Sequence, residues 1–216
     1  MKYITLSLIS PNFDDEKLKS ATFAGLVDIF EDRIRNWFLQ PVDCLLEIPH
    51  CHISAVAILV AYFEGIEIYQ TGVDSRNRSF EFFARGFSKV FPLQNCEERL
   101  LNDIHRAFYD QVRCGFVHDG MFRNRVFFSD IHPKPIIFTF PKINDTLETS
   151  RIESIVINPK LLFESVRNHF ENYLKDLRES NNEELKRNFQ AAVDLKWGLD
   201  EEDPAIGMTE EEFYAT

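Results

Sequence analysis

Two residues in the middle of the chain have the types and the spacing for acid–base and phosphate chemistry. Arg113 and His118 stand five positions apart in the segment Arg-Cys-Gly-Phe-Val-His. The pKa of a histidine is close to neutrality, so it can take a proton from a 2′-hydroxyl or give one to a leaving oxygen. A guanidinium can hold a phosphate through two hydrogen bonds and stabilise the charge that develops on it. Together, the two groups suffice for RNA cleavage without a metal.

The spacing of this pair raises a geometric question. On an ideal α-helix, residues five apart differ by about 140° around the axis, so Arg113 and His118 would not share a face. Gly115 lies between them, and a glycine could allow a local break that brings them together. Alternatively, the site is composite, and each subunit of a dimer supplies one pair.

A charged stripe leads up to Arg113. Residues of alternating charge follow one another at intervals of three or four: Arg99, Asp103, Arg106, Asp110 and Arg113. One interpretation is a solvent-facing ladder of salt bridges, each adding about 0.3–0.5 kcal/mol. The other is a stripe that orients Arg113 and faces a partner helix or a phosphate backbone.

The segment from Phe108 to Met121 resembles the HEPN superfamily, whose helical domains carry an R-x4-6-H motif. The match rests on Val-Arg-x-Gly-x-x-His-x-Gly-Met at the end of a predicted helix, and the helix pattern extends it to about residues 20–125. The resemblance implies a dimeric, metal-independent endoribonuclease in which Arg113 and His118 are catalytic. Arg106, Cys114 and Asp119 are then the expected substrate contacts. Cys114 stands where the family usually has a polar residue, and Gly120 stands where one toxin subgroup has a tyrosine.

The remaining candidates are structural. Glu64, in an apolar helix, is a candidate buried partner for an arginine; the alternative is an exposed helix edge. The His50-Cys51-His52 run is more typical of the beginning of a helix than of a metal site, because adjacent residues rarely bind one ion and no second pair at zinc spacing completes a site. A serine–histidine–aspartate arrangement, a phosphate-binding glycine loop and a dinucleotide fingerprint are absent from the sequence. We therefore expect neither a metal nor a cofactor.

Periodicity predicts a mainly α-helical fold. Apolar residues recur every three or four positions over residues 20–40, 52–69, 79–91 and about 96–115, with Pro41 expected to end the first helix. Short β-branched and aromatic runs at 125–129, 136–140 and 152–157 predict a β-hairpin or three-strand insertion between residues 124 and 158. Asn158 and Pro159 suit the cap and first turn of a long helix to about residue 178, and a short helix is expected over 183–192. The expected fold is a HEPN-like bundle of four or five helices.

Composition limits the class of protein. The net charge is −11, and residues 179–216 carry −8 of it, with eleven acidic and three basic side chains. We therefore divide the chain into a helical domain, residues 1–178, and an acidic C-terminal helix and tail, residues 179–216. The 21 phenylalanines predict an aromatic core and dimer interface. Four cysteines without a C-x-x-C pair indicate free, mostly buried thiols in a reducing compartment, and we expect a cytoplasmic protein with no membrane span.

Three hypotheses remain open from the sequence. The first is the endoribonuclease, with RNA as substrate, a homodimer as the active form and a neutralising or regulatory protein as a further partner. The second is a catalytically silent member of the same fold that binds RNA or protein. In the third, the chain is an unrelated helical interaction protein in which Arg113 and His118 are structural.

Overall fold

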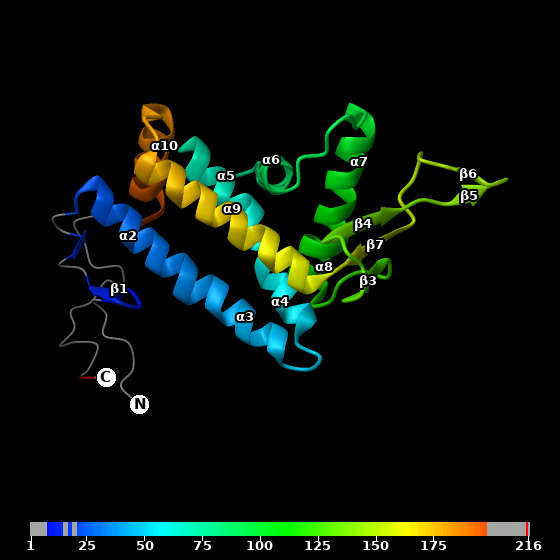
Figure 1. Cartoon of the computed structure of the whole chain (residues 1–216), viewed down its shortest axis with the longest axis horizontal. Coiled ribbons are helices and arrows are strands. Elements are labelled where there is room, and N and C mark those ends of the chain that lie inside the picture. The colour runs from blue at the N-terminus through cyan, green and yellow to red at the C-terminus, as the bar shows by residue number, and fades with distance from the viewer. Residues whose placement is uncertain (1–7, 15–16, 19–20, 198–214, 216) are drawn as a thin grey trace.

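The computed structural model describes residues 8–14, 17–18, 21–197 and 215. It is mainly α-helical with small sheets of a few strands, as the sequence predicts (Figure 1). Two long helical rods lie side by side: the first comprises α2 (Phe23–Arg33), η1 (Ile34–Leu39) and α3 (Gln40–Glu47), and the second is α9 (Pro159–Glu179). Behind them are α4 (His52–Leu59), α5 (Ala61–Thr71) and α6 (Ser79–Val90).

The first rod differs from prediction at Pro41, where the helix was expected to end. It continues to Glu47, because η1 is a wide π-helical turn immediately before the proline. The amide of Gln40 donates to the carbonyl of Arg35, five residues back. A proline within a regular α-helix lacks one donor and collides with the preceding turn, and a widened turn accommodates both defects.

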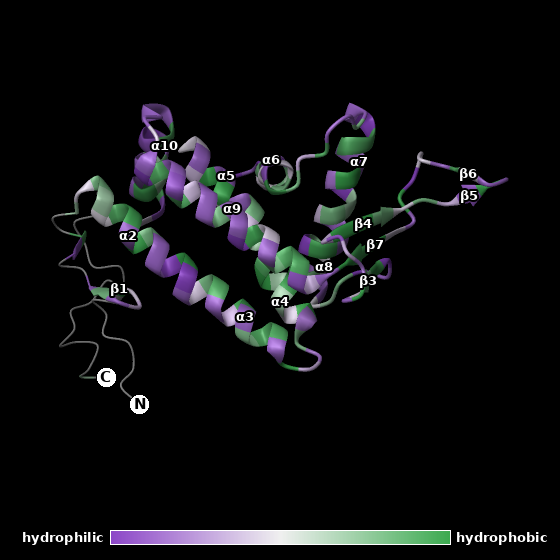
Figure 2. Cartoon of the chain, viewed as in Figure 1, coloured by the Kyte–Doolittle hydropathy of each residue, from purple (hydrophilic) through white to green (hydrophobic). Residues whose placement is uncertain are grey.

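The helix that carries the motif is continuous. It consists of α7 (Glu98–Phe108), a second wide turn η2 (Tyr109–Cys114) and the short α8 (Gly115–Asp119). Figure 2 shows hydrophobic and hydrophilic residues in alternating bands along α7 and α9, which fits helices that bury one face. Gly115 has ordinary helical angles (φ −53°, ψ −52°), so the helix is not broken there, and the first of the two alternatives for bringing Arg113 and His118 together does not apply.

A three-stranded sheet lies at one end of the molecule, within residues 124–158 as predicted. Its order is β3 (Val126–Phe128), β7 (Ser154–Ile157), β4 (Ile136–Thr139); β7 pairs parallel with β3 and antiparallel with β4. A hairpin of β5 (Lys142–Ile143) and β6 (Thr146–Leu147) projects beyond it (Figure 1). Strands were expected only in this region, but β1 (Leu8–Ser10) and β2 (Phe13–Asp14) form a further small sheet.

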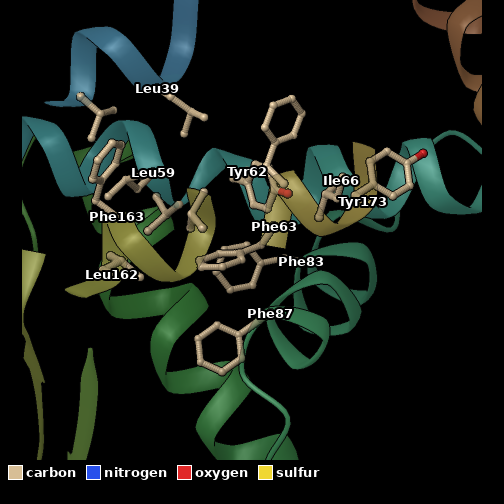
Figure 3. Packing of buried hydrophobic residues seen from close by; sticks show 14 of the residues in the cluster. Leu39, Leu59, Tyr62, Phe63, Ile66, Phe83, Phe87, Leu162, Phe163 and Tyr173 are labelled. Atoms are coloured by element: carbon tan, nitrogen blue, oxygen red, sulfur yellow. The ribbon is translucent and has the colours of Figure 1, made fainter. Parts of the chain in front are cut away.

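One aromatic-rich core joins the helices. Phe63 of α5 contacts Phe83 and Phe87 of α6 edge-on, with ring centroids 5.4 Å apart in each pair (Figure 3). The predicted cap at Asn158 is present: its side chain accepts from the amide of Leu161 at 3.2 Å. The phenylalanines therefore build the interior, as their number predicted for the core.

The last described helix, α10 (Glu183–Trp197), is five residues longer than expected and packs on α5. Phe189 and Val193 are fully buried in the same core as the other helices. The division at residue 178 therefore separates the chain by charge, while α10 shares the core of the preceding helices. The rest of the acidic tail, residues 198–216, lies outside the described residues except for residue 215.

Two expectations from the composition concern the burial of the cysteines and the absence of a membrane span. Cys44 is exposed and the other three cysteines are half-buried, so the thiols are not mostly buried. Among the described residues, the stretch His52–Thr71 is long and apolar enough to cross a membrane by length and composition alone. Half of it is buried inside the protein, and core helices pass the same test.

Candidate functional site

Arg113 is held beside α5 by the wide turn η2. Its Nη2 lies 3.4 Å from Oε2 of Glu64, the residue expected to accept an arginine, and its guanidinium carbon lies 5.4 Å from the centre of the Tyr109 ring. The side chains of Arg113 and Glu64 are 26% and 18% exposed. The arginine is therefore oriented by two neighbours and remains accessible to an anion.

Arg113 and Glu64 line an open pocket of about 390 Å³ between α4–α5 and the motif helix. Small and apolar side chains of α4, α5 and α8 form most of its wall, and Lys196 of α10 reaches it from the other side. Nζ of Lys196 is 2.9 Å from Oδ1 of Asp74. Two cationic side chains, Arg113 and Lys196, and one carboxylate, that of Glu64, thus line the pocket. A second carboxylate, that of Asp74, is paired with Lys196.

His118 lies one residue before the end of α8. The chain leaves the helix at Gly120, whose φ of 71° is the left-handed conformation that glycine adopts most easily. The side chain of His118 is exposed and makes no hydrogen bond to any residue that the structure describes. It does not line the pocket of Arg113. Within one chain, the two motif residues lie at the same end of the helix, and no hydrogen bond joins their side chains.

Gly115 allows close packing of the chain that follows α8. A Cβ at this position would lie 3.1 Å from the carbonyl oxygen of Met121 and 3.2 Å from the amide of Arg123. That amide donates to the carbonyl of Gln111 at 3.1 Å. The glycine thus allows the chain after α8 to fold back against the motif helix.

The three expected substrate contacts have different surroundings. Arg106 is exposed and stacks on Phe80 of α6, with its guanidinium carbon 3.5 Å from the ring centre. Cys114 is half-buried. Oδ2 of Asp119 accepts from Nε of Arg123 at 3.0 Å.

The salt-bridge ladder, one of the two interpretations of the charged stripe, is not formed. None of the ion pairs within the described ranges joins two of its members, and Arg113 bonds to Glu64 of another helix. Burial raises the pKa of the Tyr109 phenol, and the adjacent Arg113 guanidinium opposes this shift. The environment of Arg113 therefore comes from tertiary packing against α5.

The sequence reasoning missed Arg123, Arg125 and Lys196. Arg123 and Arg125 follow the motif directly, and the returning chain brings both arginines back beside the motif helix. The signal for this return was the pair Gly115 and Gly120, one allowing close approach and the other a left-handed turn. Lys196 comes from α10 and has no local signal.

A second polar pair lies in a groove between α6 and α7. The Ser88 hydroxyl and Nε2 of His105 are 2.8 Å apart, and burial lowers the pKa of His105. For the residues that the structure covers, no carboxylate bonds to the other ring nitrogen. Ser88 and His105 therefore satisfy each other's hydrogen-bonding groups in a partly buried position, which is a structural role.

Across the ranges that the structure describes, no group of three or more His, Cys, Asp or Glu side chains is arranged to hold a metal ion, and this includes the run from His50 to His52.

Comparisons with known proteins gave no match. No protein-family model, curated protein or solved structure matches the chain. The geometry of the site is therefore the basis for assigning a function.

Proposed function

We propose that this protein is a HEPN-like, metal-independent endoribonuclease that acts as a homodimer. One observation carries the proposal. Arg113 is held by Glu64 at an open pocket, and the exposed His118 lies five residues later, in the last turn of the same helix. An oriented guanidinium and an accessible imidazole without a hydrogen-bond partner among the described residues are the groups that 2′-hydroxyl chemistry needs.

The reaction uses the substrate's own 2′-hydroxyl as nucleophile. His118 of one subunit removes the 2′-proton while the 2′-oxygen forms a bond to phosphorus. The bond between phosphorus and the 5′-oxygen breaks, and the second His118, in its protonated form, gives that oxygen a proton. Arg113 stabilises the charge on the phosphoryl oxygens, and Glu64 positions Arg113. The products are a 2′,3′-cyclic phosphate and a 5′-hydroxyl.

A dimer supplies what one chain lacks. No hydrogen bond joins the side chains of Arg113 and His118 within a chain, so a cleft between two motif segments is the simplest way to bring them to one phosphate. Val117 and Met121, on either side of His118, are 60% and 61% exposed, which is unusual for large apolar side chains. Their exposure supports an interface at the motif.

A second candidate is a catalytically silent protein of the same fold that binds RNA or another protein. The observation that favours it is the 3.4 Å approach of Glu64, which partly neutralises Arg113 within the chain. Cys114, in place of the usual polar residue of the family, removes one contact to the phosphate. Binding without cleavage would select this candidate.

The test is incubation of the purified protein with single-stranded RNA in the presence of EDTA. We expect cleavage, with 2′,3′-cyclic phosphate or 3′-phosphate ends. His118→Ala should reduce the rate at least about 10²-fold, as is typical for a general acid–base residue. Arg113→Ala should cost about 10²–10³-fold, as for the loss of one charge-stabilising donor.

The matched controls are Arg106→Ala, an exposed arginine of the same helix, and His132→Ala, a loop histidine outside the motif. Both should retain nearly full activity. A requirement for Mg²⁺, or full activity of His118→Ala, would remove Arg113 and His118 from the mechanism.

A further inference from the structure

A larger pocket of about 620 Å³ adjoins the motif on its other side. It lies between the motif helix, the returning chain at residues 121–125 and the beginning of β7. Asp119, the residue after His118, is part of its wall. We call it the Arg123/Arg125 pocket, after the two arginines that line it.

The wall of the Arg123/Arg125 pocket is fixed by backbone hydrogen bonds to both the helix and the sheet. The Arg123 amide donates to the Gln111 carbonyl at 3.1 Å, and the Ile155 amide of β7 donates to the Arg125 carbonyl at 2.8 Å. The close approach to Gly115 holds the same segment from behind. The pocket is thus a built feature of the fold.

Its polar side chains include hydrogen-bond donors and acceptors. Nε of Arg123 bonds to Asp119, which leaves both Nη groups of that arginine. Among the described residues, Nη1 of Arg125 reaches only the Ile152 carbonyl, at 3.5 Å. The carboxylates are those of Asp119 and Glu153, with side chains 49% and 47% exposed, and Oε2 of Glu153 lies 3.5 Å from Nη2 of the exposed Arg151. Ala107 and Met121 add apolar surface.

This combination matches one nucleobase better than the others. Guanine presents two adjacent acceptors, O6 and N7, which arginine binds in bidentate fashion. Its opposite edge presents two donors, N1–H and the N2 amino group, which a carboxylate accepts. Adenine offers an amino group beside N7 and is read by amides, and the pyrimidines lack N7. The volume is within the usual range for a site that holds one small ligand.

We propose that the Arg123/Arg125 pocket binds a guanine nucleotide, with Arg125 on O6 and N7 and Glu153 on N1–H and the N2 amino group. In RNA, this nucleotide is the neighbour of the phosphate at His118, and the pocket decides where the strand is cut. The placement in RNA rests on the proposed ribonuclease function, whereas the recognition of guanine does not.

The first experiment measures the binding of GMP, AMP, CMP and UMP to the full chain by calorimetry. We expect GMP to bind at least about tenfold more tightly than AMP, the discrimination of one good bidentate pair. Arg125→Ala should weaken GMP binding by a similar factor, and Glu153→Gln should reduce the preference for GMP over AMP. Arg76→Ala, an exposed arginine in the turn after α5, is the matched control and should change neither. Equal binding of GMP and AMP, or equal effects of Arg125→Ala and Arg76→Ala, would overturn the proposal.

A second arm distinguishes a guanine in RNA from a free nucleotide. Wild type and Arg125→Ala are incubated with a single-stranded RNA that contains isolated guanines, and the cut positions are mapped. Cuts next to guanines in wild type, dispersed in Arg125→Ala, support the placement in RNA. GMP selectivity without guanine-directed cutting assigns the pocket to a free nucleotide. If wild type does not cut at all but binds GMP through Arg125, the ribonuclease function fails and the guanine site stands.

Discussion

His169 is a half-buried titratable residue outside the candidate site. It lies on α9 with Nδ1 2.9 Å from the Tyr62 hydroxyl, and its ring meets the Tyr62 ring edge-on. Burial lowers the pKa of His169 to about 4, and the positive charge of Lys89 adds to this shift. The folded protein therefore holds this imidazole neutral at a pH where an exposed histidine would be protonated.

The stability of the fold should consequently depend on pH in a defined direction. The folded pKa of about 4 lies below the ordinary 6.5, so between these values the unfolded chain binds more protons than the folded chain. The contribution is fully present above about pH 6.5 and is lost as the pH falls toward 4, by at most about 3 kcal/mol. His105, with a pKa also lowered by burial, acts in the same direction.

His169→Gln tests this assignment, because glutamine does not titrate and can still bond to the Tyr62 hydroxyl. Urea-unfolding free energies at about pH 4.5 and about pH 7.5 should differ less in the variant than in wild type. Equal differences in the two proteins would show that His169 does not account for the acid sensitivity.

At the scale of the elements, the closest approach in the core is between α6 and α5. A Cβ on Gly86 would lie 1.9 Å from the carbonyl oxygen of Phe63, so α6 packs directly on the backbone of α5. Gly65, also in α5, has no atom within 4 Å of a Cβ built on it. These two helical glycines therefore have opposite roles: one is required by packing, and the other only adds flexibility.

The same substitution should therefore have opposite effects at these two positions. Gly86→Ala must separate α6 from α5, and we expect a loss of about 3 kcal/mol or more in the free energy of unfolding. Gly65→Ala should increase stability by about 0.5–1 kcal/mol, because alanine favours the helix. Urea unfolding of both variants measures the difference. Similar effects from the two changes would contradict the packing of α6 on α5.

The sequence predicted best the features that depend on near neighbours. Asn158 and Pro159 begin α9, because a helix cap and a first turn need particular residues at particular positions. The wide turn η1 could not be predicted, because it depends on how the rod packs as well as on Pro41.

At the scale of the whole molecule, the site assembles residues from distant parts of the chain. Arg113, His118 and Glu64 were candidates from their residue types alone. Glu64 precedes Arg113 by 49 positions, however, and only the packing of the two helices brings their side chains within 3.4 Å. Lys196 reaches the same pocket from α10, which sequence reasoning had assigned to an acidic appendage. The acidic charge of residues 179–216 suggested a separate tail. In the structure, α10 packs on the other helices because Phe189 is buried in their core.

The proposed function makes a further demand on the whole molecule: the active cleft must contain residues of two subunits. Mixing Arg113→Ala with His118→Ala should then restore part of the activity that each variant lacks. Only hybrid dimers hold one intact Arg113 and one intact His118 in the same cleft, each from a different subunit. Because the second His118 of the proposed mechanism is missing from the hybrid, the restored rate should stay well below that of wild type while exceeding that of either single variant. Activity is measured on RNA with EDTA, after the mixed variants have exchanged subunits.

The matched comparison adds Val117→Asp to both variants. Val117 is 60% exposed beside His118, and a charge there should keep the chains monomeric without disturbing the core. Because Val117 also lines the pocket of Arg113, the same comparison is made with Met121→Asp, at a 61% exposed residue that does not line that pocket. Light scattering should find dimers for the single variants and monomers for the double ones, and the double variants should regain no activity on mixing. If mixing restores nothing although the single variants form dimers and exchange subunits, the arginine and the histidine act within one chain. The two side chains would then have to come together when RNA binds.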